Sequence, residues 1–331
     1  MSNIKTNSFI YVIRITLSSF STSGIFLTNL YKIDCMSWVL LAIVGTFFWA
    51  SANIVDKVLR TKYLKSSIAL TASFGIVGLV FSFILLLVIG IPSLSLQHLT
   101  AALVAGILMP YLIIPYLKSL SLEEASRVVP LWHLSPVFTL VLAVIFLNEI
   151  LTPLRYVAFA IILLGGFLIS ARRIGTAFHL SPAVALMLFS SFLVAIVDVL
   201  LKFAYSSGIF WGIFFAWYFG MTLSQLSLFI LPTVRKNFSR SFRKHNFAIV
   251  IFLSVLSGFI GFVLYSNAIS IGPITLVSVF VSFQSLFVLI LAMFISLKFP
   301  RIIKETIDAK TIGIKMVAIG LMAFGLLLLS F

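Results

Sequence analysis

Two stretches of the sequence, residues 66–117 and residues 246–297, each run for 52 residues without a single Asp, Glu, Lys or Arg. A helix that crosses a bilayer needs about 20 mostly apolar residues, so each stretch is too long for one crossing. The segments Gly90–Ser93 and Ile271–Pro273 contain the Gly and Pro residues that mark turns. Each stretch therefore predicts two membrane-spanning helices joined by a tight, uncharged turn.

The composition of the whole chain excludes a water-soluble protein. Hydrophobic residues make up 62% of it and charged residues 9%, whereas soluble domains are about 45–50% apolar and about 25% charged. The apolar runs lack the alternation of a membrane β-barrel, so helices must satisfy the backbone in lipid. We predict an all-α polytopic membrane protein with ten transmembrane helices, at residues 38–57, 67–89, 99–117, 127–147, 153–171, 182–204, 209–231, 247–269, 274–297 and 312–330.

Residues 1–36 form an N-terminal extension of a different character. Ser and Thr interrupt a weakly apolar stretch that also holds Arg14, and Met36 directly precedes the first strong span. The extension is interpreted either as a start assigned too early, ahead of Met36, or as a weak extra span or a targeting segment. The single cysteine, Cys35, excludes an intramolecular disulfide and a metal site built from cysteines.

An internal repeat divides the remaining sequence. When residue n of the first half is placed over residue n+149, seven residues fall on identical residues of the second half: Tyr116, Ser121, Val128, Phe138, Leu140, Leu142 and Ala143. A three-residue segment that ends at Asp56 matches one that ends at Asp198, at a spacing of 142. We predict two five-helix repeats, residues 37–174 and residues 175–331. Chance similarity between helices of the same apolar composition is the alternative.

The odd number of helices in each repeat has a geometric consequence. The second repeat enters the membrane from the opposite side, so the two repeats are inverted relative to one another. Inverted repeats around a site near the midplane are the architecture of many secondary transporters, in which the two halves exchange conformations to give alternating access. The chain has no Gly-rich phosphate loop of an ATP-driven pump.

Several motifs make the chain similar to a known family. They are the first helix at residues 38–57, the run Ser126–Leu131 leading into Pro136–Phe138, the run Phe146–Thr152, the Gly165-Gly166 helix, and Ala268–Leu276 and Gln284–Phe287 in the second half. Over residues 37–331 the chain resembles the EamA-type ten-helix members of the drug/metabolite transporter superfamily. Asn148 stands where the family usually has Gly. The resemblance implies a ten-helix carrier of a small solute, and it does not identify that solute.

The basic residues predict the orientation and one kind of partner. The formal net charge is +15. The gaps after the odd-numbered helices hold 17 Lys and Arg, against two in the opposite internal gaps. The positive-inside rule places the odd-numbered gaps in the cytoplasm and the C-terminus outside; superfamily members with two cytoplasmic termini suggest the alternative orientation.

The expected contacts of these basic residues are anionic lipid head groups, not nucleic acid. The loop Arg235–Lys244 is interpreted as a cytoplasmic anchor, with regulatory lipid binding as the alternative.

Charged residues inside spans are costly and are candidates for function. Asp198 is the first candidate for solute binding and for proton coupling, and Asp56 is the second candidate for coupling. Lys202 lies four residues after Asp198, a spacing that permits pairing on one helix face. The alternative for Asp198 is therefore a self-neutralising pair with Lys202. The alternative for Asp56 is an interfacial charge.

The fourth helix supplies two further candidates, Trp132 and His133, which lie between Pro130 and Pro136. Prolines free backbone carbonyls, and broken helices often line a cavity. The imidazole could bind solute or relay a proton, because its unperturbed pKa lies near neutrality. A structural hydrogen bond to a neighbouring helix is the alternative for His133.

Neutral polar residues within spans complete the candidate site. Asn53 and Gln284 are predicted to contact solute, with hydrogen bonding between helices as the alternative. Gln225 and Asn267 have the same two interpretations. Glu149 is predicted to be solvated at a helix end, and Glu123 and Glu124 are predicted to lie in a loop. No metal site is predicted, because the four His residues are dispersed along the chain.

These observations predict a secondary transporter of small organic metabolites in the cell membrane, with a midplane site lined by the first, fourth, sixth and ninth helices. It is predicted to be no enzyme, to need no cofactor and to be compatible with a homodimer. The alternatives are an intramembrane enzyme that acts on lipid-linked substrates, against which the scarcity of acidic residues argues, and a membrane scaffold that transports nothing.

Overall fold

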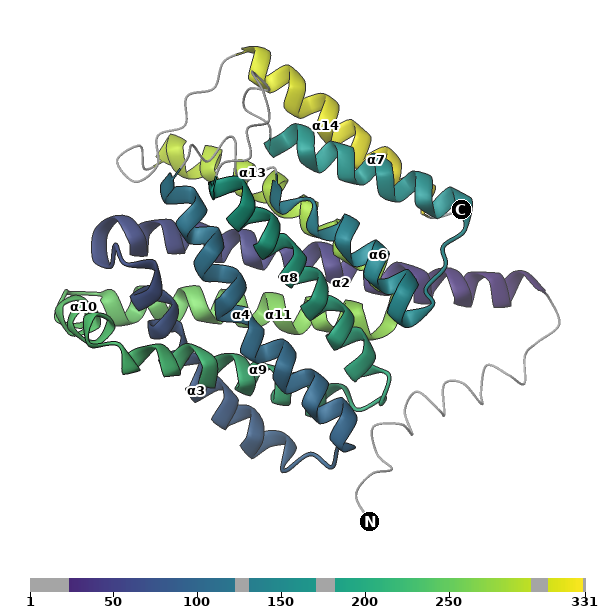
Figure 1. The fold of residues 1–331 in the computed structure, drawn as a ribbon. Coiled ribbons are helices and arrows are strands. Elements are labelled where there is room, and N and C mark those ends of the chain that lie inside the picture. The colour runs from purple at the N-terminus through teal and green to yellow at the C-terminus, as the bar shows by residue number, and fades with distance from the viewer. Residues whose placement is uncertain (1–23, 123–130, 171–181, 299–308, 330–331) are drawn as a thin grey trace.

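The computed structural model describes residues 24–122, 131–170, 182–298 and 309–329, and within these ranges it contains helices and no β-strand (Figure 1). The helices are α2 (Gly24–Val58), which continues into η1 (Leu59–Tyr63), α3 (Ser67–Ile89), α4 (Leu96–Leu122), α6 (Ser135–Leu147), α7 (Pro153–Ser170), α8 (Pro182–Tyr205), α9 (Phe210–Ser227) with η2 (Leu228–Ile230), α10 (Pro232–Phe242), α11 (Phe247–Ile271), α12 (Ile274–Val279), η3 (Phe280–Ser282), α13 (Phe283–Lys298) and α14 (Ala309–Leu328).

Six segments of the described chain are long and apolar enough to cross a membrane: Trp38–Val58, Ser67–Ile89, Leu96–Tyr116, Pro182–Tyr205, Phe210–Ile230 and Phe247–Ile271. Four shorter apolar helices lie at Ser135–Leu147, Pro153–Leu168, Ile274–Val288 and Met316–Leu328. The chain is therefore a multi-pass integral membrane protein. Among the described residues, six of the ten expected spans therefore have the length and composition of a membrane-spanning helix.

Two features differ from the sequence-based expectation. The segment after the seventh predicted span, expected to be a basic loop, folds into the helix α10. The first predicted span is the second part of a longer helix, because α2 begins at Gly24 and runs without interruption through residues 24–36. This part of the extension is thus continuous with the first span and is not a separate helix. Residues 1–23, Glu123 and Glu124 lie outside the described residues.

The long helices pack in a pattern that pairs the two halves of the chain. The helix α2 lies along α11 and α13, and α8 lies along α4 and α6 (Figure 1). The helices α3 and α9 form another pair, and α7 and α14 form a pair at one side of the bundle (Figure 1). Each of these pairs joins one helix from residues 37–174 to one helix from residues 175–331.

Glycine residues set the closest approaches between helices. At Gly45 of α2 an added Cβ would lie 3.1 Å from the carbonyl oxygen of Gly261 on α11. At Gly106 of α4 it would lie 2.1 Å from the carbonyl oxygen of Trp217 on α9. Small residues let helix backbones approach in lipid, where packing rather than the hydrophobic effect drives association. In contrast, α3 meets α11 through rings: Phe81 stacks on Phe259 with centroids 4.9 Å apart.

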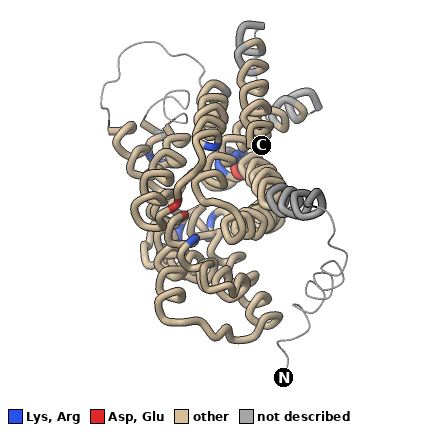
Figure 2. Tube along the Cα trace, turned by 90° about the vertical axis from the view of Figure 1, so that its right-hand side faces the viewer, with Lys and Arg blue, Asp and Glu red and all other residues tan. Residues whose placement is uncertain are grey.

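Charge is distributed unequally between the two ends of the bundle. We call the end where α2 finishes and α10 lies the basic end, and the end where α11 finishes and α12 begins the capped end. A view along α2 shows a trace that is almost entirely uncharged, with Lys and Arg more frequent than Asp and Glu (Figure 2). Exposed basic side chains gather at the basic end, namely Lys62, Lys65, Arg235, Lys236, Arg240, Arg243 and Lys244.

Candidate functional site

Two helices of the bundle are interrupted, and the interruptions fall at equivalent positions of the predicted sequence repeat. Residues 131–132 are helical, His133 and Leu134 form a turn, and α6 then begins at Ser135. In the second half α12 passes through the short segment η3 before α13 begins at Phe283. The spacing of 149 places His133 over Ser282, the last residue of η3. Broken helices at membrane depth expose backbone groups and commonly form solute sites.

The two interruptions meet in the interior. The ring nitrogen Nε2 of His133 lies 3.1 Å from the hydroxyl oxygen of Ser285 on α13. Ser282 is buried, and its hydroxyl has no hydrogen-bond partner among the described residues. It packs against Gly166 of α7, where an added Cβ would lie 2.7 Å from the Ser282 oxygen. Since most buried polar atoms are hydrogen-bonded, Ser282 offers an uncommitted polar group at the break.

Asp198 lies on α8 and is only 5% exposed. The hydroxyl of Thr139 on α6 donates to its carboxylate at 3.5 Å. The hydroxyl of Tyr265 on α11 is buried without a hydrogen-bond partner among the described residues. The alternative reading of Asp198, a pair with Lys202, is wrong: the Lys202 amine donates instead to backbone carbonyls at the end of α11. The spacing of four residues permits a pair on one helix face, but it does not take into account that the long lysine side chain can reach carbonyls on another helix.

Lys202 and Glu149 together cap the break between α11 and α12. The Lys202 amine donates to the carbonyls of Ile269 at 2.8 Å and Gly272 at 2.6 Å. The Glu149 carboxylate accepts from the amides of Ile274 and Thr275, each at 2.9 Å. A cation at a helix C-terminus and an anion at a helix N-terminus both complement the helix dipole. The prediction that Glu149 is solvated is therefore wrong.

Tryptophan covers this capped break. The ring of Trp38 packs on Gly272, where an added Cβ would lie 2.7 Å from the indole. The same ring contacts Phe280 of η3 edge-on, with centroids 5.8 Å apart. The start of the first span thus closes over the turn that Lys202 and Glu149 hold, and the capped end is tightly packed there.

Asp56 lies far from this region, in the last turns of α2 at the basic end. It is half-buried and accepts a short hydrogen bond from the hydroxyl of Ser254 on α11. The structure thus separates the two acids that the sequence offered for ion coupling, with Asp198 towards the capped end and Asp56 at the basic end.

The other predicted solute contacts divide into two groups. Trp132 is half-buried and packs on Tyr116, with ring centroids 4.8 Å apart. Gln284 is half-buried beside Ser285, so Trp132, His133 and Gln284 all lie at the two interruptions. Asn53 is exposed on α2 and does not join them. Gln225, for which the sequence allowed either a solute contact or hydrogen bonding between helices, is buried against Gly75 of α3.

Sequence reasoning missed four polar groups of the site: Thr139, Tyr265, Ser282 and Ser285. Two of them carried a signal. Tyr265 is the repeat partner of Tyr116, and Ser285 belongs to the Gln284–Phe287 motif. Thr139 and Ser282 resemble many other hydroxyl residues in apolar helices, and only their positions opposite Asp198 and at the break single them out.

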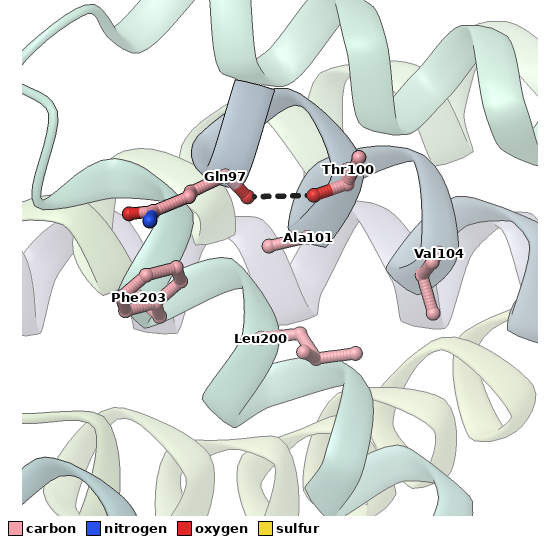
Figure 3. Close-up of a pocket in the computed structure, with 6 residues that line it drawn as sticks. All are labelled: Gln97, Thr100, Ala101, Val104, Leu200 and Phe203. Carbon is pink, nitrogen blue, oxygen red and sulfur yellow. Dashed lines mark hydrogen bonds between the residues drawn. The ribbon is translucent and has the colours of Figure 1, made fainter. Parts of the chain in front are cut away.

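An open pocket of about 530 Å³ lies elsewhere, where α4 begins and α8 ends. Gln97, Thr100, Ala101 and Val104 of α4 and Leu200 and Phe203 of α8 line it (Figure 3). The hydroxyl of Thr100 is committed to the Gln97 carbonyl at 3.0 Å. The lining is mostly apolar and contains none of the predicted site residues. Within the described ranges no three His, Cys, Asp or Glu side chains gather to hold a metal ion.

Comparison with known proteins agrees with this architecture. A solved structure titled "Crystal structure of protein" superimposes with a TM-score of 0.67 at 14% identity, and the match covers 88% of this chain and 96% of that one. At this identity the likeness concerns the fold alone. None of the curated proteins matches the chain. The model of the EamA-like transporter family matches residues 36–171, which include the interrupted helix with Trp132 and His133. Through this region, the chain is similar to the EamA-like transporter family.

Proposed function

We propose that the chain is a secondary, non-ATP transporter of small organic metabolites that works by alternating access around a site at the two helix interruptions. One observation carries the proposal. The interruptions at His133–Leu134 and at Phe280–Ser282 occupy the same register of the sequence repeat, and a contact between His133 and Ser285 joins them. Paired discontinuous helices at a repeat interface are where secondary transporters bind solute.

The helix pairing supports ten spans in two inverted repeats, residues 37–174 and residues 175–331. The first helix of one half, α2, packs on the third and fourth helices of the other half, α11 and α12–α13. The first helix of the second half, α8, packs on α4 and α6, the third and fourth helices of the first half. A two-fold relation between the halves produces this reciprocal pattern.

The residues at the site have distinct proposed roles. His133, Ser282 and Gln284 supply polar groups to the solute, and Trp132 supplies an aromatic face. Asp198 is the proposed proton-coupling residue, because it is buried, it accepts from the hydroxyl of Thr139, and the amine of nearby Lys202 donates to backbone carbonyls instead. Asp56 is the lesser candidate, since it lies at the basic end. Asn53 is exposed on α2, away from the two interruptions, and stays a predicted solute contact outside this group.

The proposed location is the cell membrane, with the basic end in the cytoplasm. The basic side chains of Arg235, Lys236 and Arg240 are exposed there, whereas the capped end buries its charges on helix termini. Excess Lys and Arg mark the cytoplasmic side of a membrane protein.

Counterflow in proteoliposomes, screened over pools of small metabolites, tests the transporter proposal. Ser282→Ala removes a hydroxyl that has no partner in the described protein, so we expect unchanged stability and weaker solute binding. A lost hydrogen bond of about 1 kcal/mol corresponds to a roughly fivefold higher dissociation constant. Ser278→Ala is the matched control, because Ser278 bonds to the Thr275 carbonyl one turn earlier. The proposal fails if no pool is transported, or if both variants bind solute as the parent does.

A second measurement tests proton coupling separately. Asp198→Asn keeps an oxygen that can accept from Thr139 but cannot lose a proton, so we expect uptake to stop responding to an imposed pH gradient while the fold is retained. Asp56→Asn serves as the comparison and is expected to keep the response. An unchanged pH dependence in Asp198→Asn would remove Asp198 from the mechanism without affecting the transporter proposal.

A further inference from the structure

The helix α10 does not run with the spanning helices. In Figure 1 it is seen end-on at the edge of the bundle, whereas α2 and α11 extend across the view. Its axis therefore runs across the direction of theirs (Figure 1). It has 11 residues, fewer than the about 20 that a span requires. The helix thus lies across the basic end, in the orientation of a helix parallel to the membrane surface.

One face of α10 is fixed to the bundle. Val234 and Ser241 are buried. Phe238 packs edge-on against Phe229, with centroids 5.3 Å apart, and against Phe247 at the start of α11, with centroids 6.2 Å apart. These contacts set which side of the helix faces away from the protein.

The other face is basic. Arg235, Lys236 and Arg240 on α10 are exposed, as are Arg243 and Lys244 directly after it. Residues 232–246 contain no Asp or Glu. Lys62 and Lys65, which follow α2, are also exposed. We call these seven side chains the α10 basic patch. Asp56 is the one described acid near this end, and it is committed to Ser254.

Apolar side chains stand exposed beside the same helix. Ile230 is 77% exposed and Phe242 is 60% exposed, at opposite ends of α10, and Leu231 is also exposed. A helix that presents both basic and apolar side chains outward suits the boundary between lipid head groups and acyl chains. There the apolar side chains enter the acyl region while Lys and Arg reach the phosphates.

We propose that α10 and the α10 basic patch form a binding site for anionic phospholipid of the bilayer in which the protein sits. Juxtamembrane basic segments are attracted to anionic leaflets, and the seven positive charges of the patch have no acidic neighbours among residues 232–246. The exposed rings and aliphatic side chains favour a lipid over free inorganic phosphate, which offers no apolar surface.

The site is connected to the spanning helices through the backbone. Ser241 donates to the Tyr63 carbonyl at 2.9 Å, and the Lys244 amine donates to the same carbonyl at 2.7 Å and to that of Lys62 at 3.3 Å. These carbonyls end the segment that continues α2, the helix that carries Asp56. Lipid bound at α10 therefore holds the end of α2 close to the start of α11. This effect does not depend on which solute the protein carries.

Lipid titration of the purified full chain in neutral detergent tests the proposal. We expect phosphatidylglycerol to bind and to raise the melting temperature more than phosphatidylcholine does, and we expect this preference to fall as salt is added. The variant Arg235→Gln/Lys236→Gln/Arg240→Gln should bind phosphatidylglycerol about 100-fold more weakly, at roughly fivefold for each charge lost near the surface.

The variant Arg235→Lys/Lys236→Arg/Arg240→Lys is the matched control. It keeps the three charges and changes the same side chains, so it should bind like the parent. Equal binding of both lipids by the parent overturns the proposal, and so does parent-like binding by the Gln variant. If the Gln variant does not fold, the lipid preference and the salt dependence of the parent chain decide whether the patch binds anionic phospholipid. Inorganic phosphate at the same concentration should give no shift, and a shift equal to that of the lipid would also overturn the lipid assignment.

Discussion

The contact between α4 and α9 and the contact between α3 and α11 are equivalent under the proposed repeat, yet they are packed differently. In each, the third helix of one half meets the second helix of the other. The backbones of α4 and α9 come close at Gly106 and Gly220, where added Cβ atoms would lie 2.1 Å from the Trp217 carbonyl and 2.9 Å from the Leu103 carbonyl. The helices α3 and α11 are held apart by stacked rings.

This difference shows how one repeated element adopts two packing states in a single structure. A direct contact between backbones excludes anything between the helices, whereas a contact through rings separates them by the width of the side chains. In an alternating-access transporter the two equivalent contacts exchange these roles. Under the proposed alternating access, this structure corresponds to the state in which α4 and α9 are in direct backbone contact.

The largest expected effect follows from adding a methyl group at the closed contact. Gly106→Ala places a Cβ against the α9 backbone, which cannot move as a side chain can, so we expect a loss of about 3 kcal/mol in stability. Thermal unfolding in detergent measures it. Gly258→Ala on α11 is the matched control, because nothing lies within 4 Å of the added Cβ. Equal stability of the two variants would contradict the description of α4–α9 as closed.

The cap at Glu149 tests whether the capped end supports that closed state. Glu149→Gln loses the charge that faces the amides of Ile274 and Thr275, and hydrogen bonds to charged groups contribute about 1.5–3 kcal/mol. Because one amide oxygen remains, we expect a loss of about 1–2 kcal/mol, measured by the same thermal unfolding.

A second substitution at Glu149 separates the effect of its negative charge on stability from the effect of its side-chain packing. Glu149→Asp keeps the charge on a shorter side chain, so it is expected to retain part of the stability that Glu149→Gln loses. If Glu149→Gln is as stable as the parent chain, the carboxylate does not stabilise the start of α12.

The smallest effect is expected at the looser contact. Phe81→Leu removes the stacking on Phe259 but leaves an apolar side chain, so we expect a loss of about 1 kcal/mol, the size of an aromatic pair interaction. Phe83→Leu, a lipid-facing change on the same helix where the side chain is 62% exposed, should leave the melting temperature unaltered. A larger loss for Phe81→Leu than for Gly106→Ala would reverse the comparison.

The sequence was sufficient for features set by local composition. The span expected at residues 67–89 coincides with α3, because an apolar run between polar ends defines a transmembrane helix without help from its neighbours. The interruption near His133 was also accessible, since Pro130 and Pro136 flank it.

The sequence was insufficient where a side chain acts on a distant helix. Lys202 follows Asp198 by one turn, yet it caps α11, and Glu149 caps a helix more than 120 residues away. Which carbonyls and amides a long side chain reaches depends on the packing of the helices, which the order of residues along one helix does not specify. The helix α10 was missed for a related reason: its polar composition suits a loop, and its helical form depends on Phe238 packing against Phe229 and Phe247.

The glycine contact between Gly45 and Gly261 has a consequence for what can move as a unit. The helix α2 packs directly on α11, and α8 lies along α4. Each of these closely packed helix pairs therefore contains one helix from each half of the chain. Under the proposed alternating access, the moving bodies would therefore each contain helices of both halves, and one half would not move as a unit against the other. Either half produced by itself would lack the partner of its first helix, so folding competence resides in the joined chain and not in the single repeat.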